Sequence, residues 1–310
     1  MKLLASVCAI FYCFFSVLSV SAGEIAITFD DAPREDTAYF SGNERTQRLI
    51  HNLAAAGIQS TLFFVLGKNI VPQTQGRLEA YVAAGHFLAN HSFDHLSANT
   101  VVIEDVRKDI DTAHALLTKQ NGFTAYYRPP YLHYGETETK RDQLLSHLKT
   151  RGYQLGYVTV DNYDWYMDSI FQKAVASGKI IDHKALGDLY VNLLWESIVF
   201  YDQLALKTLG RSPKHVLLLH ENDLAALYVG QLQRFLKAKG WKIITPEAAY
   251  SDAIAHKVPE VLFHKQGRVA ALARAKGVPE PELRSAPEST AYLDEQFSKH
   301  HVFIDAPLAH

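Results

Sequence analysis

The feature of this chain that most limits its fold is an alternation of short apolar runs with longer amphipathic segments, which begins at Glu24. The runs are EIAITF, STLFFVLG, HFLAN, AYYRPPY, YQLGYVTV, HVLLLH and WKIITP. Strands that are apolar on both faces and alternate with helices form parallel sheets, because the helices cover both faces. About seven such units favour a barrel over an open sheet. We therefore predict an α/β fold, a distorted (β/α)7-type barrel.

Helical periodicity predicts helices between these runs, several of which end in glycine. The clearest are residues 43–56, 103–119, 136–151 and 224–239. Two stretches break the rhythm. Between Trp165 and His215 we predict an extra helix or helical pair, and after Tyr250 the chain becomes rich in proline, alanine and charge. We expect a main domain at 23–250 and a C-terminal extension at 251–310 that packs on it or is partly mobile.

Composition excludes several classes of function. The 310 residues are 48% hydrophobic, enough for one large domain with its own core. The formal net charge is only −2, so no basic surface for nucleic acid is visible and we expect no nucleic-acid partner. We expect a monomer.

The N-terminus reads MKLLASVCAIFYCFFSVLSVSAGE, with one basic residue, an apolar run and then small residues. This pattern is typical of a secretory signal peptide, which we place at 1–22, although the run approaches the length of an uncleaved membrane anchor. Cys8 and Cys13 both lie inside it. The mature protein would then have no thiol and no membrane span, and would be exported, periplasmic or secreted. Cysteine nucleophiles, cysteine zinc sites and disulfides are excluded together.

Polar residues follow the first and third apolar runs, and the ends of parallel strands are where functional loops converge. Asp30 and Asp31 follow the first run. In an extended segment they would point to opposite sides and serve different tasks, although an Asp pair here is also common in turns and N-caps. His91 and His95 follow the third run, and on a helical turn they would share a face and one metal ion. The alternative is two exposed polar side chains.

Three later runs also end in polar residues. Arg128 precedes a rigid Pro-Pro pair, where it could orient a carboxylate or lie in a surface turn. The next run ends in VTVDNYDWY, which places Asp161, Asp164 and Trp165 beyond an apolar strand. His220 follows HVLLL, as a buried core histidine or as a proton donor.

These strand ends, in this order, resemble the motifs of the polysaccharide deacetylase family, also called the NodB-homology domain or carbohydrate esterase family 4. The similar segments are TFDDAP, HSFDH, RPPYLHYG, DNYDW and LLLH. The resemblance extends from about Glu24 to about Tyr250, so it implies a NodB-like catalytic domain at 23–250.

The first three motifs imply the base and the metal site. By resemblance, Asp30 is the general base, and Asp31, His91 and His95 ligate one divalent metal ion. Zinc is the ion expected, and cobalt, manganese or nickel can replace it in related enzymes. Arg128 is similar to the residue that orients the base.

The remaining motif residues imply the acid and the substrate pocket. The backbone N–H of Tyr131 is similar to an oxyanion donor. Asp164 is similar to the partner of His220, the expected general acid. Trp165 and Leu218 are similar to residues that form the wall of the acetyl-methyl pocket. Tyr131 also counts among the expected substrate-binding residues.

The resemblance implies hydrolytic removal of N-acetyl groups from N-acetylglucosamine-containing polysaccharide or oligosaccharide, peptidoglycan or chitin-type, with release of acetate. The same groups could cleave O-acetyl esters, and a catalytically silent carbohydrate-binding relative is the alternative from another class. Two features depart from the family pattern. Ala32 stands where glycine is common, and the distance between the fourth and fifth motifs is long. Asp161 has a supporting role by resemblance.

Overall fold

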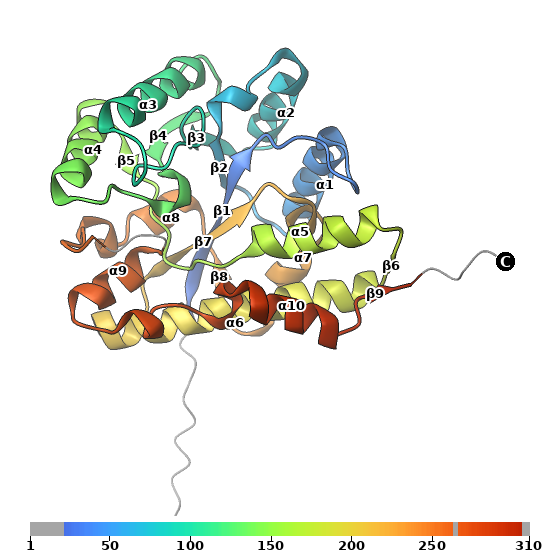
Figure 1. The fold of residues 1–310 in the computed structure, drawn as a ribbon. Helices are drawn as coiled ribbons and strands as arrows, with labels where there is room; N and C mark the ends of the chain where they lie inside the picture. Colours follow the sequence, from blue (N-terminus) through green and yellow to red (C-terminus); the bar gives the residue numbers. More distant parts are fainter. Residues whose placement is uncertain (1–21, 263–265, 306–310) are drawn as a thin grey trace, which may run out of the picture.

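A parallel sheet forms the centre of the molecule (Figure 1). The computed structural model describes residues 22–262 and 266–305; the predicted signal peptide, apart from its last residue Ala22, lies outside the described residues. The strand order is β5-β4-β3-β2-β1-β7, and β8 also pairs with β1. The strands are β1 (Glu24–Ala32), β2 (Leu62–Val65), β3 (Phe87–Asn90), β4 (Phe123–Tyr127), β5 (Gln154–Leu155), β7 (Lys214–His220) and β8 (Lys242–Ile243). All their pairings are parallel, and the sheet curls into a barrel-like shape with helices around it, which confirms the predicted fold class.

One short segment connects the two edges of this sheet. The Gly156 N–H donates to the Tyr127 carbonyl oxygen of β4 at 2.7 Å, whereas Leu218 of β7 donates to the Val160 carbonyl oxygen at 3.2 Å. The predicted strand YQLGYVTV is therefore divided between two partners, with β5 on one edge and a bridge to β7 on the other. This sharing distorts the barrel, since residues 156–160 cross from one edge to the other.

Helices on the outside of the sheet follow the sequence pattern closely. They are α1 (Gly42–Ala55), α2 (Pro72–Ala83), α3 (Ile103–Leu117), α4 (Glu138–Thr150) and α7 (Asp223–Ala238). The four predicted spans agree with the observed ones within two residues at each end. Helix α1 shows why. The Ser41 side chain accepts a hydrogen bond from the Glu44 N–H and Glu44 caps Ser41 in return. The chain then leaves the helix through Gly57, with φ 70°.

The region between Trp165 and His215 forms a helical pair, which is one of the two arrangements predicted from the sequence. Helix α5 (Asp164–Ala176) is followed by β6 (Ile180–Ile181) and by the 27-residue α6 (His183–Leu209). Helix α6 packs against α7 and against α9 (Arg268–Ala275). Even α6 does not combine the length and apolar character needed to cross a membrane, and neither does any other helix in the described part of the chain.

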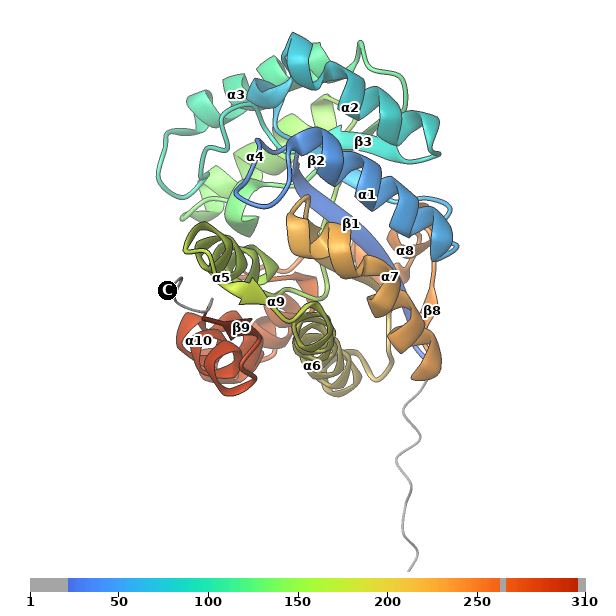
Figure 2. The same cartoon turned by 90° about the vertical axis from the view of Figure 1, so that its right-hand side faces the viewer.

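Much of the segment 266–305 lies against this helical pair, whereas the Glu260 carbonyl oxygen accepts a hydrogen bond from Arg141 of α4 at 3.1 Å. Figures 1 and 2 show α9 and α10 (Thr290–Lys299) beside α6 and α5, on the side of the sheet away from α2 and α3. Strand β9 (Phe303–Ile304) pairs antiparallel with β6, a contact that the sequence pattern did not indicate. Leu283, Leu293 and Phe297 are buried in the same core cluster as β1 and β7. The boundary at residue 250 remains a prediction.

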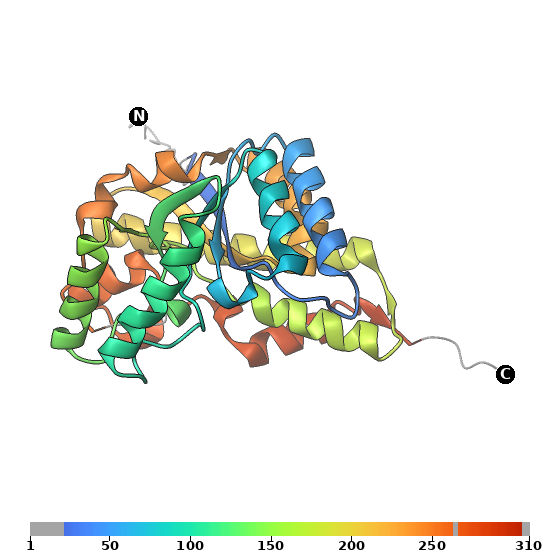
Figure 3. The ribbon, with the colours of Figure 1, turned by 90° about the horizontal axis from the view of Figure 1, so that it is seen from above.

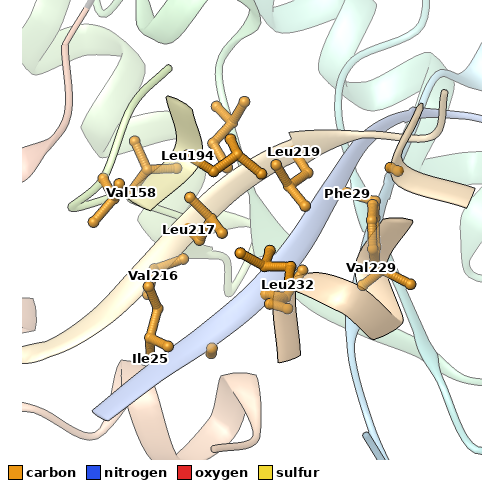
Figure 4. Packing of buried hydrophobic residues seen from close by; sticks show 14 of the residues in the cluster. Ile25, Phe29, Val158, Leu194, Val216, Leu217, Leu219, Val229 and Leu232 are labelled. Carbon is orange, nitrogen blue, oxygen red and sulfur yellow. The ribbon is translucent and has the colours of Figure 1, made fainter. Parts of the chain in front are cut away.

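The main hydrophobic core lies between the sheet and its helices. Figure 4 shows Leu217 and Leu219 of β7 next to Leu194 of α6 and Leu232 of α7, and all four are buried. Viewed from above, α1 and α2 lie on one side of β1 and α3 and α4 on the other (Figure 3). Burial on both faces explains why the strands read as continuous apolar runs and why polar side chains appear only at their ends.

Candidate active site

Strand β1 ends in a bulge that turns two carboxylates toward one place. Asp31 has a left-handed backbone, with φ 66°, and the pairing of β1 with β2 shifts register between Phe29 and Ala32. The prediction that Asp30 and Asp31 point to opposite sides is therefore wrong, because it assumed a regular extended strand. His91 Nε2 lies 3.7 Å from Asp30 Oδ2 and 3.6 Å from Asp31 Oδ1. Ala32 is buried in β1 without a positive φ, so alanine fits where glycine is common in the family motif.

Asp30 is held by a fully buried arginine. Arg128 Nη1 donates to Asp30 Oδ1 at 2.5 Å, and the guanidinium lies 3.9 Å above the ring of Phe64. Its other nitrogens donate to the Gly156 carbonyl oxygen and to the Tyr250 hydroxyl. Arg128 is 0% exposed, so the alternative of a surface turn is wrong. Because these hydrogen bonds hold the charged guanidinium on several sides, it fixes the Asp30 carboxylate in position.

His91 and His95 converge on Asp31 from an irregular loop. The predicted helical turn is wrong: Ser92 and His95 have φ values of 73° and 62°, and helix α3 begins only at Ile103. His95 Nε2 nevertheless lies 3.6 Å from Asp31 Oδ1, and the ligand atoms of the three side chains all lie within 4.8 Å of one another. His91 is buried, which also excludes the reading of two exposed polar side chains.

This cluster fits a divalent metal ion. Asp31 Oδ1 is buried and has no hydrogen-bond partner among the described residues. His91 Nδ1 lies 2.8 Å from the Arg128 carbonyl oxygen, which can only accept, so Nδ1 carries the proton and Nε2 presents its lone pair. Ligand atoms each about 2.1 Å from a tetrahedral ion are roughly 3.4 Å apart, close to the observed separations. Two imidazoles and one carboxylate are donors suited to zinc and similar ions.

The electrostatics of the cluster agree with its use as a ligand set. Burial and the neighbouring His91 lower the pKa of His95 to about 4, so its imidazole is neutral at physiological pH. Burial alone would raise the pKa of Asp31, but the neighbouring basic side chains, His220 first and Arg34 among them, outweigh it and lower that pKa. A neutral imidazole and an ionised carboxylate are the forms that bind metal.

His220 stands across the pocket in a fixed ion pair. Its Nδ1 lies 2.6 Å from Asp164 Oδ1, and its backbone N–H donates to Asp164 Oδ2 at 2.8 Å. Burial would lower the pKa of His220, but the Asp164 carboxylate, with Asp31 and Asp30, raises it to about 9. Asn222 donates to the same carboxylate at 3.0 Å. His220 lines the pocket rather than lying closed in the core, so its Nε2 can face a substrate.

The pocket between these groups has a volume of about 590 Å³. Most of the predicted site residues line it together: Asp30, Asp31, His91, His95, Tyr131, Asp161, Trp165, Leu218 and His220. Arg128 and Asp164 lie behind this lining as buried supports. Tyr131, with φ 59°, is 55% exposed and packs edge-on against His95, and Trp165 is also exposed. A pocket with polar groups at its base and aromatic rings at its mouth suits a carbohydrate.

Some residues of the site were not identified from the sequence. Arg34 lines the pocket, two residues after Ala32 in the first motif. The Asn162 Nδ2 donates to the Leu218 carbonyl oxygen at 2.7 Å, and its Oδ1 accepts the Asp164 N–H at 2.9 Å. Asn162 therefore connects the segment of Asp164 with the strand that leads to His220. Asn162 stands inside the quoted motif DNYDW and Arg34 directly follows TFDDAP, and these positions were a usable signal. Tyr250 could not have been found, because it reaches Arg128 from the end of α8 (Pro246–Tyr250).

Residues 19–155 match the family model described as polysaccharide deacetylase. The chain is therefore similar to this family over the residues that carry the first three motifs. The match ends before Asp164 and His220, so the second half of the site is described by the geometry above rather than by the family model. The match over residues 19–155 and the parallel barrel-like sheet together confirm the family resemblance found in the motifs.

Two curated proteins are similar to parts of this chain. A bifunctional xylanase/deacetylase of Pseudobutyrivibrio xylanivorans is 29% identical over 114 residues, which are 36% of this chain and 17% of that protein. The peptidoglycan-N-acetylmuramic acid deacetylase PdaA of Bacillus subtilis strain 168 is 27% identical over 131 residues, 42% of this chain and 47% of that one. The chain therefore spans less than half the length of either relative.

Solved structures share the fold at low identity. A carbohydrate esterase family 4 pseudoenzyme from Bacillus anthracis superposes with a TM-score of 0.52 and 16% identity, covering 74% of this chain and 66% of that chain. The Bc1960 peptidoglycan N-acetylglucosamine deacetylase superposes with a TM-score of 0.50 and 21% identity, covering 74% and 88%. Since one of these relatives is a pseudoenzyme, the shared fold alone does not establish activity.

Proposed function

We propose that this chain is a metal-dependent hydrolase that removes N-acetyl groups from an N-acetylglucosamine-containing polysaccharide or oligosaccharide, peptidoglycan or chitin-type, and releases acetate. One observation carries the proposal. The unpaired Oδ1 of Asp31 and the Nε2 atoms of His91 and His95 converge beside a separately fixed carboxylate, Asp30. Zinc is the proposed ion, and cobalt, manganese or nickel would fit the same donors.

The first half of the reaction needs a base and an activated carbonyl. When bound, the ion supplies Lewis-acid activation of the acetamide carbonyl and of water. Asp30 takes the proton of the attacking water, since its carboxylate lies beside the ligand cluster without being needed as a ligand. Arg128 holds that carboxylate in one orientation, so less entropy is lost when the reactive geometry forms.

The second half needs an oxyanion donor and an acid. In this proposal the Tyr131 N–H, at the left-handed turn after the Pro-Pro pair, donates to the carbonyl oxygen as it gains negative charge. His220 then gives its proton to the departing amine as the carbon–nitrogen bond breaks. Asp164 keeps His220 protonated at neutral pH, because the pKa of His220 is raised to about 9. Leu218 and Trp165 form the wall beside the acetyl methyl group.

The relatives support this choice of substrate. One curated relative is named for N-acetylmuramic acid and one solved structure for peptidoglycan N-acetylglucosamine, and both sugars carry the acetamide that this proposal requires.

We also propose that residues 1–22 direct export to the periplasm or medium, and that the mature protein acts as a monomer with its catalytic domain at 23–250. N-terminal sequencing of the exported protein tests the cleavage site.

The test is acetate release from N-acetylglucosamine oligomers and from peptidoglycan by the mature protein, first stripped of metal and then reconstituted with zinc. The expected result is release that zinc restores, at a ratio of one zinc per chain. A His91→Ala variant is the matched control and should neither bind zinc nor release acetate. Absence of release in all forms despite bound zinc would overturn the N-deacetylase proposal. Acetate release from acetylated xylan would then favour an esterase, and binding without release a silent relative.

A further inference from the structure

Arg34 has a rigid backbone position at the edge of the pocket. Its N–H donates to Glu221 Oε2 at 2.6 Å, and its carbonyl oxygen accepts hydrogen bonds from Arg77 Nη1 at 2.6 Å and from Arg45 Nη1 at 3.2 Å. Glu221 directly follows His220 in the chain. The backbone of Arg34 is therefore fixed relative to both the first motif and the residue expected to act as acid.

The side chain of Arg34, in contrast, has unused hydrogen-bonding capacity. Its Nη1 is buried and has no hydrogen-bond partner among the described residues, and Arg34 itself lines the same pocket as Asp31 and His220. Of the described residues that line this pocket, Arg34 alone is an arginine or lysine. The cost of burying an unpaired donor is recovered only when a ligand supplies an acceptor.

The carboxylates near Arg34 do not meet this need. Asp31 belongs to the candidate metal cluster. Burial raises the pKa of Asp168 to about 6, and Arg34 lies close enough to oppose that rise. The Oδ1 of Asp168, however, already accepts the Asp223 and Leu224 N–H groups at 3.1 and 3.2 Å. The guanidinium thus remains a planar fork of donors beside the reacting centre, and the group that matches such a fork is a carboxylate bound through two parallel hydrogen bonds.

We infer that Arg34 binds a carboxylate of the substrate, so that the preferred substrate is an acetamido sugar polymer with an acidic substituent near the scissile acetyl group. This inference rests on the proposed deacetylase function and makes it narrower, since a neutral chitin-type chain offers Arg34 no such partner. Arg34 is a specificity-determining residue in this scheme, and the chemistry of acetyl removal stays with Asp30, His220 and the metal ligands.

The test compares two probes that differ only in one charge. They are the disaccharide N-acetylglucosaminyl-N-acetylmuramic acid and the methyl ester of its lactyl carboxylate, each offered to the zinc-loaded full chain. For the native protein we expect a higher kcat/KM on the acid than on the ester. Arg34→Gln should lower kcat/KM on the acid by about 10- to 100-fold and on the ester by less than about 3-fold. Arg34→Lys keeps the charge without the fork and should recover part of the loss.

Arg48→Gln is the control for net charge, because Arg48 is exposed on α1 and stacks on Phe40 outside the pocket. It should change neither rate. Urea unfolding of Arg34→Gln shows whether the variant is folded. A third probe, an oligosaccharide with its carboxylate on a neighbouring uronic acid, reports where the charge must lie. The inference is supported if the native protein has a higher kcat/KM on either acidic probe than on the ester and if Arg34→Gln removes that difference.

Two results would overturn the inference without affecting the proposed function. The first is a native protein that deacetylates neither acidic probe faster than the methyl ester. The second is an equal loss on acid and ester in Arg34→Gln, which would show that Arg34 acts only through the electrostatics of Asp31. In contrast, a native protein that releases acetate from no probe refutes the proposed function itself. Binding of the acid to Asp30→Asn, measured by calorimetry with and without Arg34→Gln, then still tests recognition of the carboxylate.

Discussion

The two sides of the pocket differ in how their polar atoms are satisfied. On the acid side, both carboxylate oxygens of Asp164 accept hydrogen bonds, from His220 and from Asn222. On the metal side, Asp31 Oδ1 accepts none from any described residue and faces His91 Nε2 at 3.6 Å. A buried oxygen without a hydrogen-bond partner, such as Asp31 Oδ1, is available to a ligand. The Asp164 carboxylate, whose two oxygens both accept hydrogen bonds, instead gives the proton of His220 a constant electrostatic environment.

The two arginines of the site repeat this difference. Arg128 uses its donors on Asp30, Gly156 and Tyr250, and no room remains for a substrate. Arg34 lines the pocket, and its buried Nη1 has no hydrogen-bond partner among the described residues. The structural role of the first and the proposed recognition role of the second follow from that contrast, and substitutions can separate them.

The largest effect should come from removing the charge on the metal side. Asp31→Asn retains the shape of the side chain but loses the anionic oxygen, so zinc should no longer survive dialysis, and acetate release should fall by about 10³-fold or more. Asp30→Asn is the matched control on the adjacent residue. It should keep its zinc and still lose about 10²- to 10⁴-fold in rate, as expected for a lost general base. Zinc retained by Asp31→Asn would remove Asp31 from the ligand set.

A smaller effect, this time on stability, should distinguish the two arginines. Arg128→Met leaves the Asp30 carboxylate buried without its partner, and breaking a buried ion pair on one side typically costs about 3–5 kcal/mol of unfolding free energy. Arg34→Met should cost less than about 1 kcal/mol, because Arg34 Nη1 has no hydrogen-bond partner among the described residues. Urea titrations of both metal-stripped variants give the comparison. Equal losses would mean that Arg34 is as structural as Arg128.

The acid side should show itself in the pH dependence of stability. The pKa of His220 is raised from 6.5 to about 9, so the folded protein holds a proton that the unfolded chain releases. The contribution is complete below about pH 6.5 and is lost as pH rises through 9, so the unfolding free energy should fall by about 2–3 kcal/mol across this window. Metal-free protein is the sample for urea titrations at pH 6.5 and 9.

Asp164→Asn is the variant that tests the cause of this slope. Without the carboxylate, burial is the dominant influence and the pKa of His220 falls, so the slope between pH 6.5 and 9 should flatten. Other histidines titrate equally in both proteins and cancel in the difference. A slope unchanged by Asp164→Asn would assign it to groups outside the acid side.

The sequence predicted the identity of the site residues better than their local geometry. Apolar runs fixed the strand ends, and the polar residues there came together in one pocket as expected. The positive φ values of Asp31 and His95 could not be read from letters, because they depend on the register between β1 and β2 and on how the loop before α3 is anchored. Sequence rules assumed regular strand and helix where the site needs neither.

Contacts between distant segments were equally hidden. Glu288, in the short helix at Ala286–Glu288, accepts a hydrogen bond from Tyr201 of α6 at 2.5 Å and contributes to the raised pKa of Asp161, after burial itself. A segment rich in proline and charge gave no sign that it would supply a buried carboxylate behind the fourth motif. Such packing depends on tertiary complementarity, which neither periodicity nor composition encodes.

The smallest predicted effect concerns the loop that carries His95. Ser92 Oγ accepts the His95 N–H at 3.0 Å and so helps to hold the left-handed turn that points this imidazole at Asp31. Ser92→Ala removes that acceptor, and a single hydrogen bond of about 0.5–1.5 kcal/mol corresponds to a roughly 2- to 10-fold weaker affinity for zinc. Competition with a chelator measures it. Ser177→Ala, at the end of α5, removes a comparable hydroxyl bond away from the site and should leave the affinity unchanged. If both variants bind zinc equally well, the metal side is fixed by its backbone turns alone, and the two sides of the pocket are more alike in rigidity than their hydrogen bonds indicate.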